Sequence, residues 1–522
     1  MKNLFKIFIS SAVVLASFSS CKKDLNLTPT NDIINEQVYA SAAGYKQVFT
    51  KVYASFATVG GSGAGDNGDV KGIDAGASDF VRLYWNVQEL TSDEGLCVWS
   101  DPGVYDLNNM TFTSDNILLQ GLYSRSIYQI TIANEFLRES TPEKLASRNI
   151  TGAAADEIAK NRAEIRFLRA YQYWVLMDLF GNPPFLTEDN LIGKVAPQQI
   201  KRPELFKYVE AELLAIETLL PATNEYGRVT QGADWMLLSR LYLNANVYTG
   251  TAKNTEAITY ASKVIAGGYA LQTTYKNLFL ADNNVNNRET ILAINYDGNF
   301  TQNFGGTTFL VNASINGDMD PKSFGVPNGG WGGIRSRSTL PAAFTDAADK
   351  RAMFFGDKAA NDNVAVFTDG LRVTKFRNVT QGGLTPPSSN GTFSSVDFPL
   401  FRLPEAYLNY AEAVLRGGSG GSTTNAIAYV NRLRERAYGS TAGNVTSLTL
   451  DNILTERAKE FYWEGYRRTD LVRFGKFTDG SYLWPFKGGI KAGRAVASSR
   501  NIFPLPSSDV IANTNLTQNP GY

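Results

Sequence analysis

Apolar side chains recur at the spacing of an α-helix in several long segments of the chain. The first segment runs from Val38 to Phe56, a second from Ile117 to Leu137, and the most regular from about Ala154 to Phe180. Gly181 and a pair of prolines follow the third segment directly and are typical of a helix end. We therefore expect the first half of the chain to be mainly helical.

Two further pairs of helical segments have the pattern of helical hairpins. Trp235–Tyr248 is followed by Thr255–Ile265, and Pro404–Leu415 is followed by Thr424–Ala437. In each pair a helix rich in alanine and tyrosine precedes one with alanine and β-branched residues. Small residues let helices approach closely, as in tetratricopeptide-like repeats. The pattern predicts a mostly α fold built on a tetratricopeptide-like scaffold of helical hairpins.

Segments of a different composition separate the helical blocks. Gly60–Gly76, Asp282–Gly333 and Val379–Ser395 are dense in Gly, Asn, Ser and Thr, with scattered aromatic residues. We expect them to form long irregular surface loops with a few short strands. We divide the chain into a helical N-terminal region, 36–275, and a C-terminal region, 276–522. Binding residues often lie on loops held by a rigid scaffold, so we expect the ligand-binding loops in the C-terminal region.

The start of the chain has the pattern of a secretory signal. Two lysines precede a short apolar run that ends near Leu15, and small residues then precede Cys21. The run is too short to span a bilayer. A cysteine after the cleavage site is the lipid attachment residue of bacterial lipoproteins. We therefore expect a signal peptide at 1–20 and a lipidated tether at 21–35 that anchors the protein to a membrane. The alternative is an ordinary signal peptide with a chance cysteine, since Phe18 stands where the usual lipobox has leucine.

The composition excludes several classes of function. The chain has 522 residues, of which 50 are basic, 50 are acidic and none is histidine. The balanced charge offers no basic surplus for nucleic acid, and the lack of histidine excludes Ser-His-Asp, Cys-His and HExxH chemistry. Cys97 is the only cysteine besides Cys21, so with Cys21 lipidated no internal disulfide can form. We expect Cys97 to be a small buried apolar residue.

Two polar motifs resemble known ligand sites only in part. Gly61–Gly65 resembles a nucleotide loop, but no predicted strand precedes it and no helix with Lys-Ser/Thr follows. Asp282–Asn287 places oxygen atoms at calcium-like spacing, yet it lacks the loop glycine and the closing glutamate. We expect no metal and no cofactor, with calcium at the second motif as the minor alternative.

A row of carboxylates is the one candidate for catalysis. Glu456, Glu460 and Glu464 fall on one face of a predicted helix, at a separation that suits a glycoside hydrolase. Four arginines lie close to them in the sequence: Arg457, Arg467, Arg468 and Arg473. Nearby cations lower the pKa of a carboxyl group, whereas a general acid needs a raised one. An interhelical ion-pair network is therefore favoured over a hydrolase.

Aromatic residues of the loops form the candidate binding surface. Trp99, Tyr296 and Trp331 stand among residues too small or too polar to bury them, and Trp331 lies between paired glycines. Flat rings suit the apolar faces of sugars, while neighbouring polar side chains can bond the hydroxyl groups. We expect these three rings to stack on the ligand and Arg335 to donate hydrogen bonds beside them. The alternative is that the rings attach the loops to the helical body.

Several motifs, together and in order, make the chain similar to the SusD/RagB family, which are cell-surface nutrient-binding lipoproteins of Bacteroidetes. The most specific pieces begin at Cys21 (CKKDL), Glu89 (ELTSDE), Arg166 (RFLRAYQYW), Leu179 (LFGNPP), Leu403 (LPEAYLNYAEA), Glu456 (ERAKEFYWEGYRRTDLVR), Pro504 (PLP) and Asn519 (NPGY). The resemblance covers nearly the whole sequence.

The resemblance implies a tetratricopeptide-like scaffold and no enzymatic activity. It also implies an outer-membrane location facing the cell surface and a partner, a SusC-like TonB-dependent transporter that the lipoprotein covers as a lid. In the starch-binding type, aromatic residues on loops hold the glycan, so an oligosaccharide is the expected ligand. Similar members bind peptides, which is the first alternative. A surface glycoside hydrolase that uses Glu456, Glu460 and Glu464 is the second.

Overall fold

The computed structural model of the chain describes residues 35–61, 65, 68–190, 196–387 and 391–522. The predicted signal peptide, Cys21 and all but the last residue of the predicted tether lie outside these residues. The described part is mostly α-helical, which confirms the predicted fold class, and its eight short strands pair into four two-stranded sheets.

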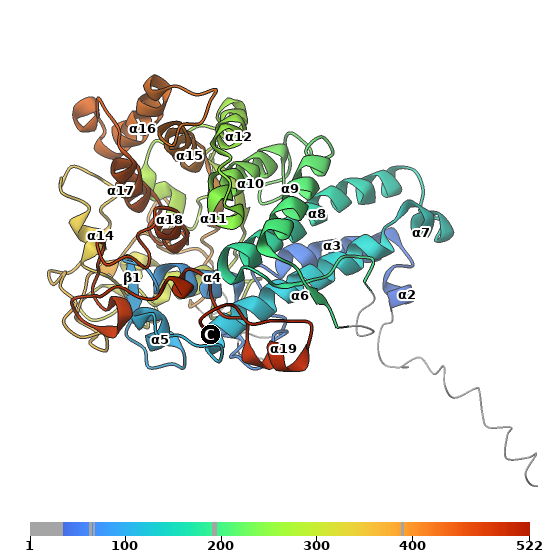
Figure 1. Cartoon of the computed structure of the whole chain (residues 1–522), viewed down its shortest axis with the longest axis horizontal. Coiled ribbons are helices and arrows are strands. Elements are labelled where there is room, and N and C mark those ends of the chain that lie inside the picture. The colour runs from blue at the N-terminus through green and yellow to red at the C-terminus, as the bar shows by residue number, and fades with distance from the viewer. Residues whose placement is uncertain (1–34, 62–64, 66–67, 191–195, 388–390) are drawn as a thin grey trace, which may run out of the picture.

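The N-terminal helices pack around one long helix, α8. The helices of this part are α2 (Asn35–Val38), α3 (Ala42–Ala54), α4 (Phe80–Glu89), α5 (Val104–Asn109), α6 (Ile117–Glu139), α7 (Pro142–Ser147), α8 (Ala153–Phe180) and α9 (Arg202–Ile216). The predictions for α6 and α8 are confirmed almost to their bounds. The predicted helix Val38–Phe56 is instead divided, because the Ser41 hydroxyl accepts a hydrogen bond from Gly44 N and starts a new helix there. The second half of α8 is buried on all sides, so this helix runs through the core (Figure 1).

The two predicted hairpins are present and lie against each other. They consist of α10 (Gln231–Leu243) with α12 (Asn254–Ala266), and of α15 (Leu403–Leu415) with α16 (Thr423–Tyr438); a short helix, α11 (Ala245–Thr249), follows α10. Helix α12 packs against α15, which joins the hairpins although they are far apart in sequence (Figure 1). Alanines at the contacts, among them Ala257, Ala261 and Ala411, are fully buried and allow the close approach.

The predicted loop Asp282–Gly333 is less irregular than expected. It contains β4 (Thr290–Ile294), which pairs with β8 (Phe398–Arg402), and α13 (Gly306–Asn312), whose residues are all buried. The expectation of a surface loop is therefore wrong for these two parts. Helix α13 packs against α4, so tertiary contacts stabilise a helix that its glycine and threonine content does not favour.

The other elements are short. The remaining strands are β1 (Gly95–Cys97), β2 (Pro184–Phe185), β3 (Gln198–Gln199), β5 (Ile334–Ser336), β6 (Phe354–Phe355) and β7 (Arg372–Val373). The remaining helices are α14 (Thr339–Ala342), α17 (Leu450–Phe461), α18 (Arg467–Arg473) and α19 (Ser507–Ala512), with 3-10 turns η2 (Gly76–Ser78), η3 (Tyr275–Phe279), η4 (Pro321–Phe324), η5 (Thr441–Gly443), η6 (Lys487–Gly489) and η7 (Ser498–Asn501). Within the described ranges, none of the helices has the length and apolar character needed to cross a bilayer.

Candidate functional site

One antiparallel strand pair brings two distant tryptophans to the same end of the molecule. In this pair, Cys97 of β1 lies opposite Ile334 of β5, and Val98 N donates a 2.9 Å hydrogen bond to Gly333 O. Trp99 follows β1 and Trp331 precedes β5. Because the strands run antiparallel, the residue after one strand and the residue before the other lie at the same end.

Glycine is required beside these rings. A Cβ atom on Gly333 would lie 2.2 Å from Nε1 of Trp99, and this glycine has a φ of +126°. Only glycine combines this backbone conformation with so close a ring. Gly333, two residues after Trp331, therefore makes room for the Trp99 ring.

The two tryptophans line an open hollow of about 420 Å³. Its lining is completed by Arg82 of α4, Asp101 and Phe304. The ring centroids of Phe304 and Trp331 are 6.0 Å apart at 66°, an edge-to-face contact that holds both rings in place. Both tryptophans are half-buried, while 38% of Phe304 is exposed, so each ring presents a surface to solvent.

Charged groups stand beside the rings of the hollow. The Arg82 guanidinium lies 5.7 Å from the centroid of the Trp99 ring, and its Nη1 donates a 3.1 Å hydrogen bond to Phe304 O. Its Nε atom is buried and has no hydrogen-bond partner among the described residues. Asp101 is exposed at the edge. The hollow thus combines flat apolar faces with donors and an acceptor, which is the combination that a sugar ring matches.

Tyr296 does not belong to this surface, and the prediction that it is an exposed ring is wrong. The side chain is 5% exposed and its hydroxyl donates to the Asp79 carboxylate at 3.3 Å. A Cβ atom on Gly306 would lie 2.3 Å from the ring, so this glycine of α13 packs directly on it. Burial raises the pKa of the Tyr296 hydroxyl well above its ordinary value. Tyr296 fixes α13 to the start of α4.

Arg335 is also buried, and the expectation that it lies beside Trp331 as an available donor is wrong. None of its side chain is exposed, its Nε donates to Phe367 O at 2.8 Å, and its Nη1 donates to Ile334 O at 2.8 Å. Burial lowers the pKa of Arg335 to about 10, with Arg372 adding to the effect. The guanidinium ties β5 to the 367 loop and does not line the hollow.

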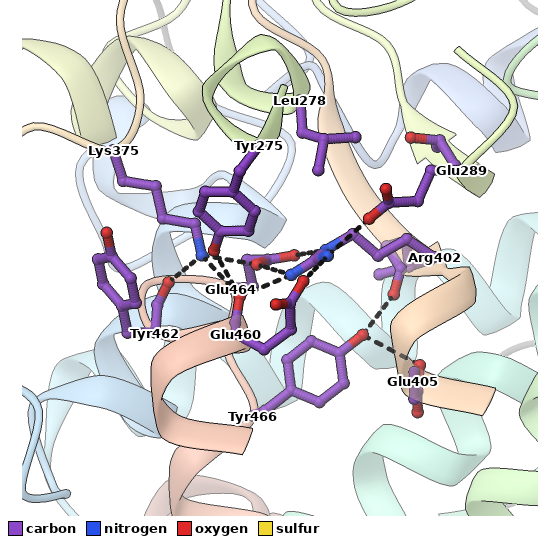
Figure 2. A network of polar contacts seen from close by, with 12 residues as sticks. Tyr275, Leu278, Glu289, Lys375, Arg402, Glu405, Glu460, Tyr462, Glu464 and Tyr466 are labelled. Atoms are coloured by element: carbon purple, nitrogen blue, oxygen red, sulfur yellow. Dashed lines mark hydrogen bonds and ion pairs between the residues drawn. The ribbon is translucent and has the colours of Figure 1, made fainter. Parts of the chain in front are cut away.

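The three glutamates lie in a buried ion-pair network, as favoured from the sequence. Figure 2 shows the part of this network around Glu460 and Glu464. Arg402, at the end of β8, bonds Glu289, Glu460 and Glu464 at 2.6–2.9 Å. All four side chains are fully buried. Burial alone would raise the pKa of Glu460, but Arg436, Arg402 and Arg351 outweigh it and hold that pKa well below its usual range. A carboxyl group so firmly ionised does not serve as a general acid near neutral pH.

Two details of the predicted row are wrong. Helix α17 ends at Phe461, and Trp463 has a φ of +68°, so Glu464 lies beyond the helix and not on its face. The cations that bind Glu456, Glu460 and Glu464 come from distant segments: Arg351, Lys375, Arg402, Arg434 and Arg436. The four arginines named from the sequence bind elsewhere. Arg457 and Arg473 pair with Asp470, Arg467 pairs with Asp93, and Arg468 donates to Asn501 O.

Other expectations concern Cys97 and the 282 motif. Cys97 is 2% exposed, which confirms that it is a buried apolar residue, and burial raises the pKa of its thiol to about 12.

In the motif Asp282–Asn287, the Asp282 carboxylate accepts a hydrogen bond from Gln381 N and the Asn283 amide donates one to Leu278 O, so these side chains bind backbone groups. No group of three or more Cys, Asp or Glu in the part of the chain described could hold a metal ion.

Three residues of the hollow were not identified from the sequence. Phe304 lies in the predicted loop Asp282–Gly333, and Asp101 lies two residues after the candidate Trp99, so the same criteria could have found them. Arg82 lies in a helical segment, three residues after Asp79, and nothing in the neighbouring sequence marks it as a binding residue. Its position in the hollow depends on how α4 packs against α13.

Comparison with known proteins agrees with this architecture. A sequence profile of the SusD family matches residues 345–522. The starch-binding protein SusD of Bacteroides thetaiotaomicron is 36% identical over the whole chain, and the match covers 99% of that protein. The chain belongs to the SusD family. Solved structures of SusD relatives share its fold, which confirms the predicted tetratricopeptide-like architecture.

Two of these structures are glycan-binding proteins by their descriptions. The surface glycan-binding protein A from Bacteroides thetaiotaomicron in complex with laminarihexaose superposes with a TM-score of 0.69 at 22% identity, covering 91% of this chain and 99% of that one. A laminarin binding SusD-like protein gives a TM-score of 0.69 at 22% identity, covering 92% and 99%. At 22% sequence identity, these two structures establish only that this chain shares their fold.

Proposed function

We propose that this SusD-family protein captures oligosaccharide at the cell surface and passes it to a SusC-like TonB-dependent transporter. The observation that carries the proposal is the hollow in which Trp99, Phe304 and Trp331 present their rings beside charged groups. The starch-binding and laminarihexaose-binding relatives support a glycan as the ligand. In this proposal the protein is held at the outer membrane by lipid on Cys21.

Each group of the hollow has a distinct role in the proposed complex. The Trp99 and Trp331 rings stack on the apolar faces of successive sugar units. Arg82 donates hydrogen bonds to hydroxyl groups, and the Asp101 carboxylate accepts them. Edge-to-face contacts with neighbouring rings hold the tryptophans before the ligand arrives, which lowers the entropic cost of binding.

The proposed activity includes no hydrolysis. The carboxyl groups of Glu456, Glu460 and Glu464 are at most 4% exposed and bind arginine and lysine side chains. A substrate cannot approach them without disrupting the core, and the arginines around Glu460 hold its pKa well below its usual range, whereas a general acid needs a raised pKa. These observations favour a binding protein over a glycoside hydrolase.

The proposal is tested by removing one stacking ring. Trp331→Ala should weaken binding of the oligosaccharide by more than about tenfold, because losing an aromatic residue at the centre of an interface costs about 2 kcal/mol or more. The melting temperature should change little, since Trp331 is half-exposed in a loop. Titration calorimetry with maltoheptaose and laminarihexaose, together with a melting curve, measures both quantities.

Tyr296→Ala provides the contrasting variant for this test. Because Tyr296 is buried against Gly306 and Asp79, its loss should lower stability by about 3–5 kcal/mol. If Trp331→Ala lowers the melting temperature by several degrees and leaves affinity unchanged, the hollow is not the binding site. Release of sugar products, or tight binding of peptides instead, would contradict the glycan-binding function.

A further inference from the structure

A second cavity lies between α3, α8 and β4. Its volume is about 400 Å³, which is within the range of small-molecule sites. Buried apolar side chains form its floor: Phe49, Phe56, Leu168, Ile294 and Leu400. Exposed polar side chains surround its mouth: Lys46, Thr50, Glu157, Glu225 and Asn295. The cavity thus has an apolar interior and a hydrophilic entrance.

The charges at the mouth favour an uncharged ligand. Lys46 and Arg228 are balanced by Glu157 and Glu225, so the entrance has no net charge. The Arg228 guanidinium is further occupied by Glu164, whose Oε2 accepts from its Nε at 3.1 Å. A ligand with apolar faces and neutral hydroxyl groups matches this environment, because it requires no buried charge.

One loop borders both the cavity and the hollow. Asn295 and Thr301 line the cavity, while Phe304 lines the hollow. Thr301 and Phe304 are three residues apart, so their Cα atoms are separated by at most about 11 Å. The Asn303 amide donates a 2.8 Å hydrogen bond to Ala57 O, which fixes the loop to the end of α3. The cavity and the hollow therefore share one short, anchored loop.

Phe300 stands on this loop, next to Thr301 of the cavity and four residues before Phe304 of the hollow. Its side chain is 84% exposed, the highest exposure among the large apolar residues described. The turn that carries it is rigid: Phe300 N and Thr301 N both donate to Asp297 O, and Gly298 N donates to the Ser395 hydroxyl at 3.0 Å. A firmly held, exposed ring is typical of a contact surface.

We propose that the cavity beneath α3 is a second site for the same glycan, with Phe300 as an additional contact on the loop that borders both sites. A chain that stacks on Trp99 and Trp331 continues over Phe300 and places further sugar units in the cavity. The protein then selects longer oligosaccharides over short ones. This inference rests on the proposed glycan-binding function and extends it to chain length.

The experiment fills the cavity and compares short with long ligands. The probes are maltotriose with maltoheptaose, and laminaritriose with laminarihexaose, titrated by calorimetry. The wild-type protein should bind the long member of its preferred series about tenfold more tightly than the trisaccharide. Ala54→Trp, from a half-buried wall position, should abolish this difference and leave trisaccharide affinity unchanged. Phe300→Ala should reduce the difference several-fold.

Two further variants keep the test decisive. Gln47→Trp is the matched control, since Gln47 is exposed on the same helix and does not line the cavity. Thr50→Trp at the exposed rim replaces Ala54→Trp if the latter does not fold. Equal affinities for short and long ligands in the wild type, or a difference that survives a folded cavity-filling variant, would overturn the second site alone. If only the second site fails, Trp331→Ala loses all oligosaccharide binding while the cavity variants still bind. If the proposed function fails, no oligosaccharide binds to the protein at all.

Discussion

At the scale of single residues, Asp397 has a buried carboxyl group and forms hydrogen bonds that link several loops. It is 5% exposed, its Oδ1 accepts from Tyr296 N at 2.8 Å, and its backbone carbonyl accepts from the Asn283 amide. Burial raises its pKa to about 7, against the lowering effects of the hydrogen bonds from Tyr296 and Tyr226. The folded protein therefore keeps a proton on Asp397 at pH values where the unfolded chain has lost it.

This raised pKa predicts a pH dependence of stability. Between pH 3.8 and about 7 the folded state binds more protons at this site than the unfolded state, so the free energy of unfolding falls as the pH rises. The slope from this group is about 1.4 kcal/mol per pH unit within that window. Asp397→Asn should remove this part of the decline, as measured by urea denaturation from pH 4 to 8. Asp189→Asn, at an exposed position, is the control and should keep the wild-type profile. Parallel curves for wild type and Asp397→Asn would contradict the prediction.

The same loop reasoning was correct for two aromatic residues and wrong for a third. Trp99 and Trp331 do present their rings to solvent, as their small and polar neighbours predicted. Tyr296 has similar neighbours, yet Asp79 and Gly306 enclose it from other segments. Small residues near an aromatic residue can mean either that the ring is uncovered or that another segment packs closely on it. Local sequence does not distinguish the two.

At the scale of elements, the long helices could be predicted because their periodicity persists over many residues. Helix α8 is the clearest example, with its apolar face and its Gly181 end. Helix α13 could not be predicted in the same way. It has seven residues with glycine and threonine at its start, and it forms because it is buried against α4. The ion pairs of α17 also depend on tertiary structure, since their cations come from segments distant in the sequence.

The ion-pair network around α17 predicts that a single conservative substitution greatly lowers the stability of the protein. Glu460→Gln keeps the shape of the side chain but removes the buried negative charge that Arg351, Arg402 and Arg436 share. The free energy of unfolding should fall by about 3–5 kcal/mol, as expected for breaking a buried ion pair from one side. Chemical denaturation measures this loss, and the folded variant should bind oligosaccharide normally at low temperature.

A surface ion pair provides the control for Glu460→Gln. Glu204 is 59% exposed and pairs with Lys207 at 2.9 Å, so Glu204→Gln should cost no more than about 0.5 kcal/mol. Similar stability losses in the two variants would show that the α17 network contributes little. Loss of a hydrolytic activity in Glu460→Gln, at unchanged stability, would favour the catalytic reading of the glutamate row.

On the scale of the whole molecule, the fold joins a helical scaffold to a loop-bearing surface. The stacked hairpins and the N-terminal helices lie beside one another (Figure 1), and their buried side chains form one continuous core. The strands β1 and β5 lead to the tryptophans of the hollow. The resemblance to the SusD/RagB family implied the tetratricopeptide-like scaffold as a whole, whereas contacts such as that of α12 with α15 are contained in no local pattern and come from the structure. The site needed the tertiary structure, since α4 supplies Arg82.

In the proposed function, attachment of the whole protein to the membrane depends on a single residue, Cys21. Cys21 lies outside the described residues, after a cationic and apolar start and before a polar stretch. Cys21→Ser should abolish lipidation, because the thioether to the lipid requires the thiol. Each acyl chain buries many CH₂ groups at about 0.8 kcal/mol each, so without them the protein should leave the membrane fraction and become soluble. Membrane fractionation and incorporation of radiolabelled palmitate, in a bacterial host with lipoprotein processing, measure the loss of the anchor.

The purified soluble variant should keep wild-type glycan affinity, since the hollow is formed by residues far along the chain from the anchor. Label that still enters Cys21→Ser would show that the anchor lies at another residue.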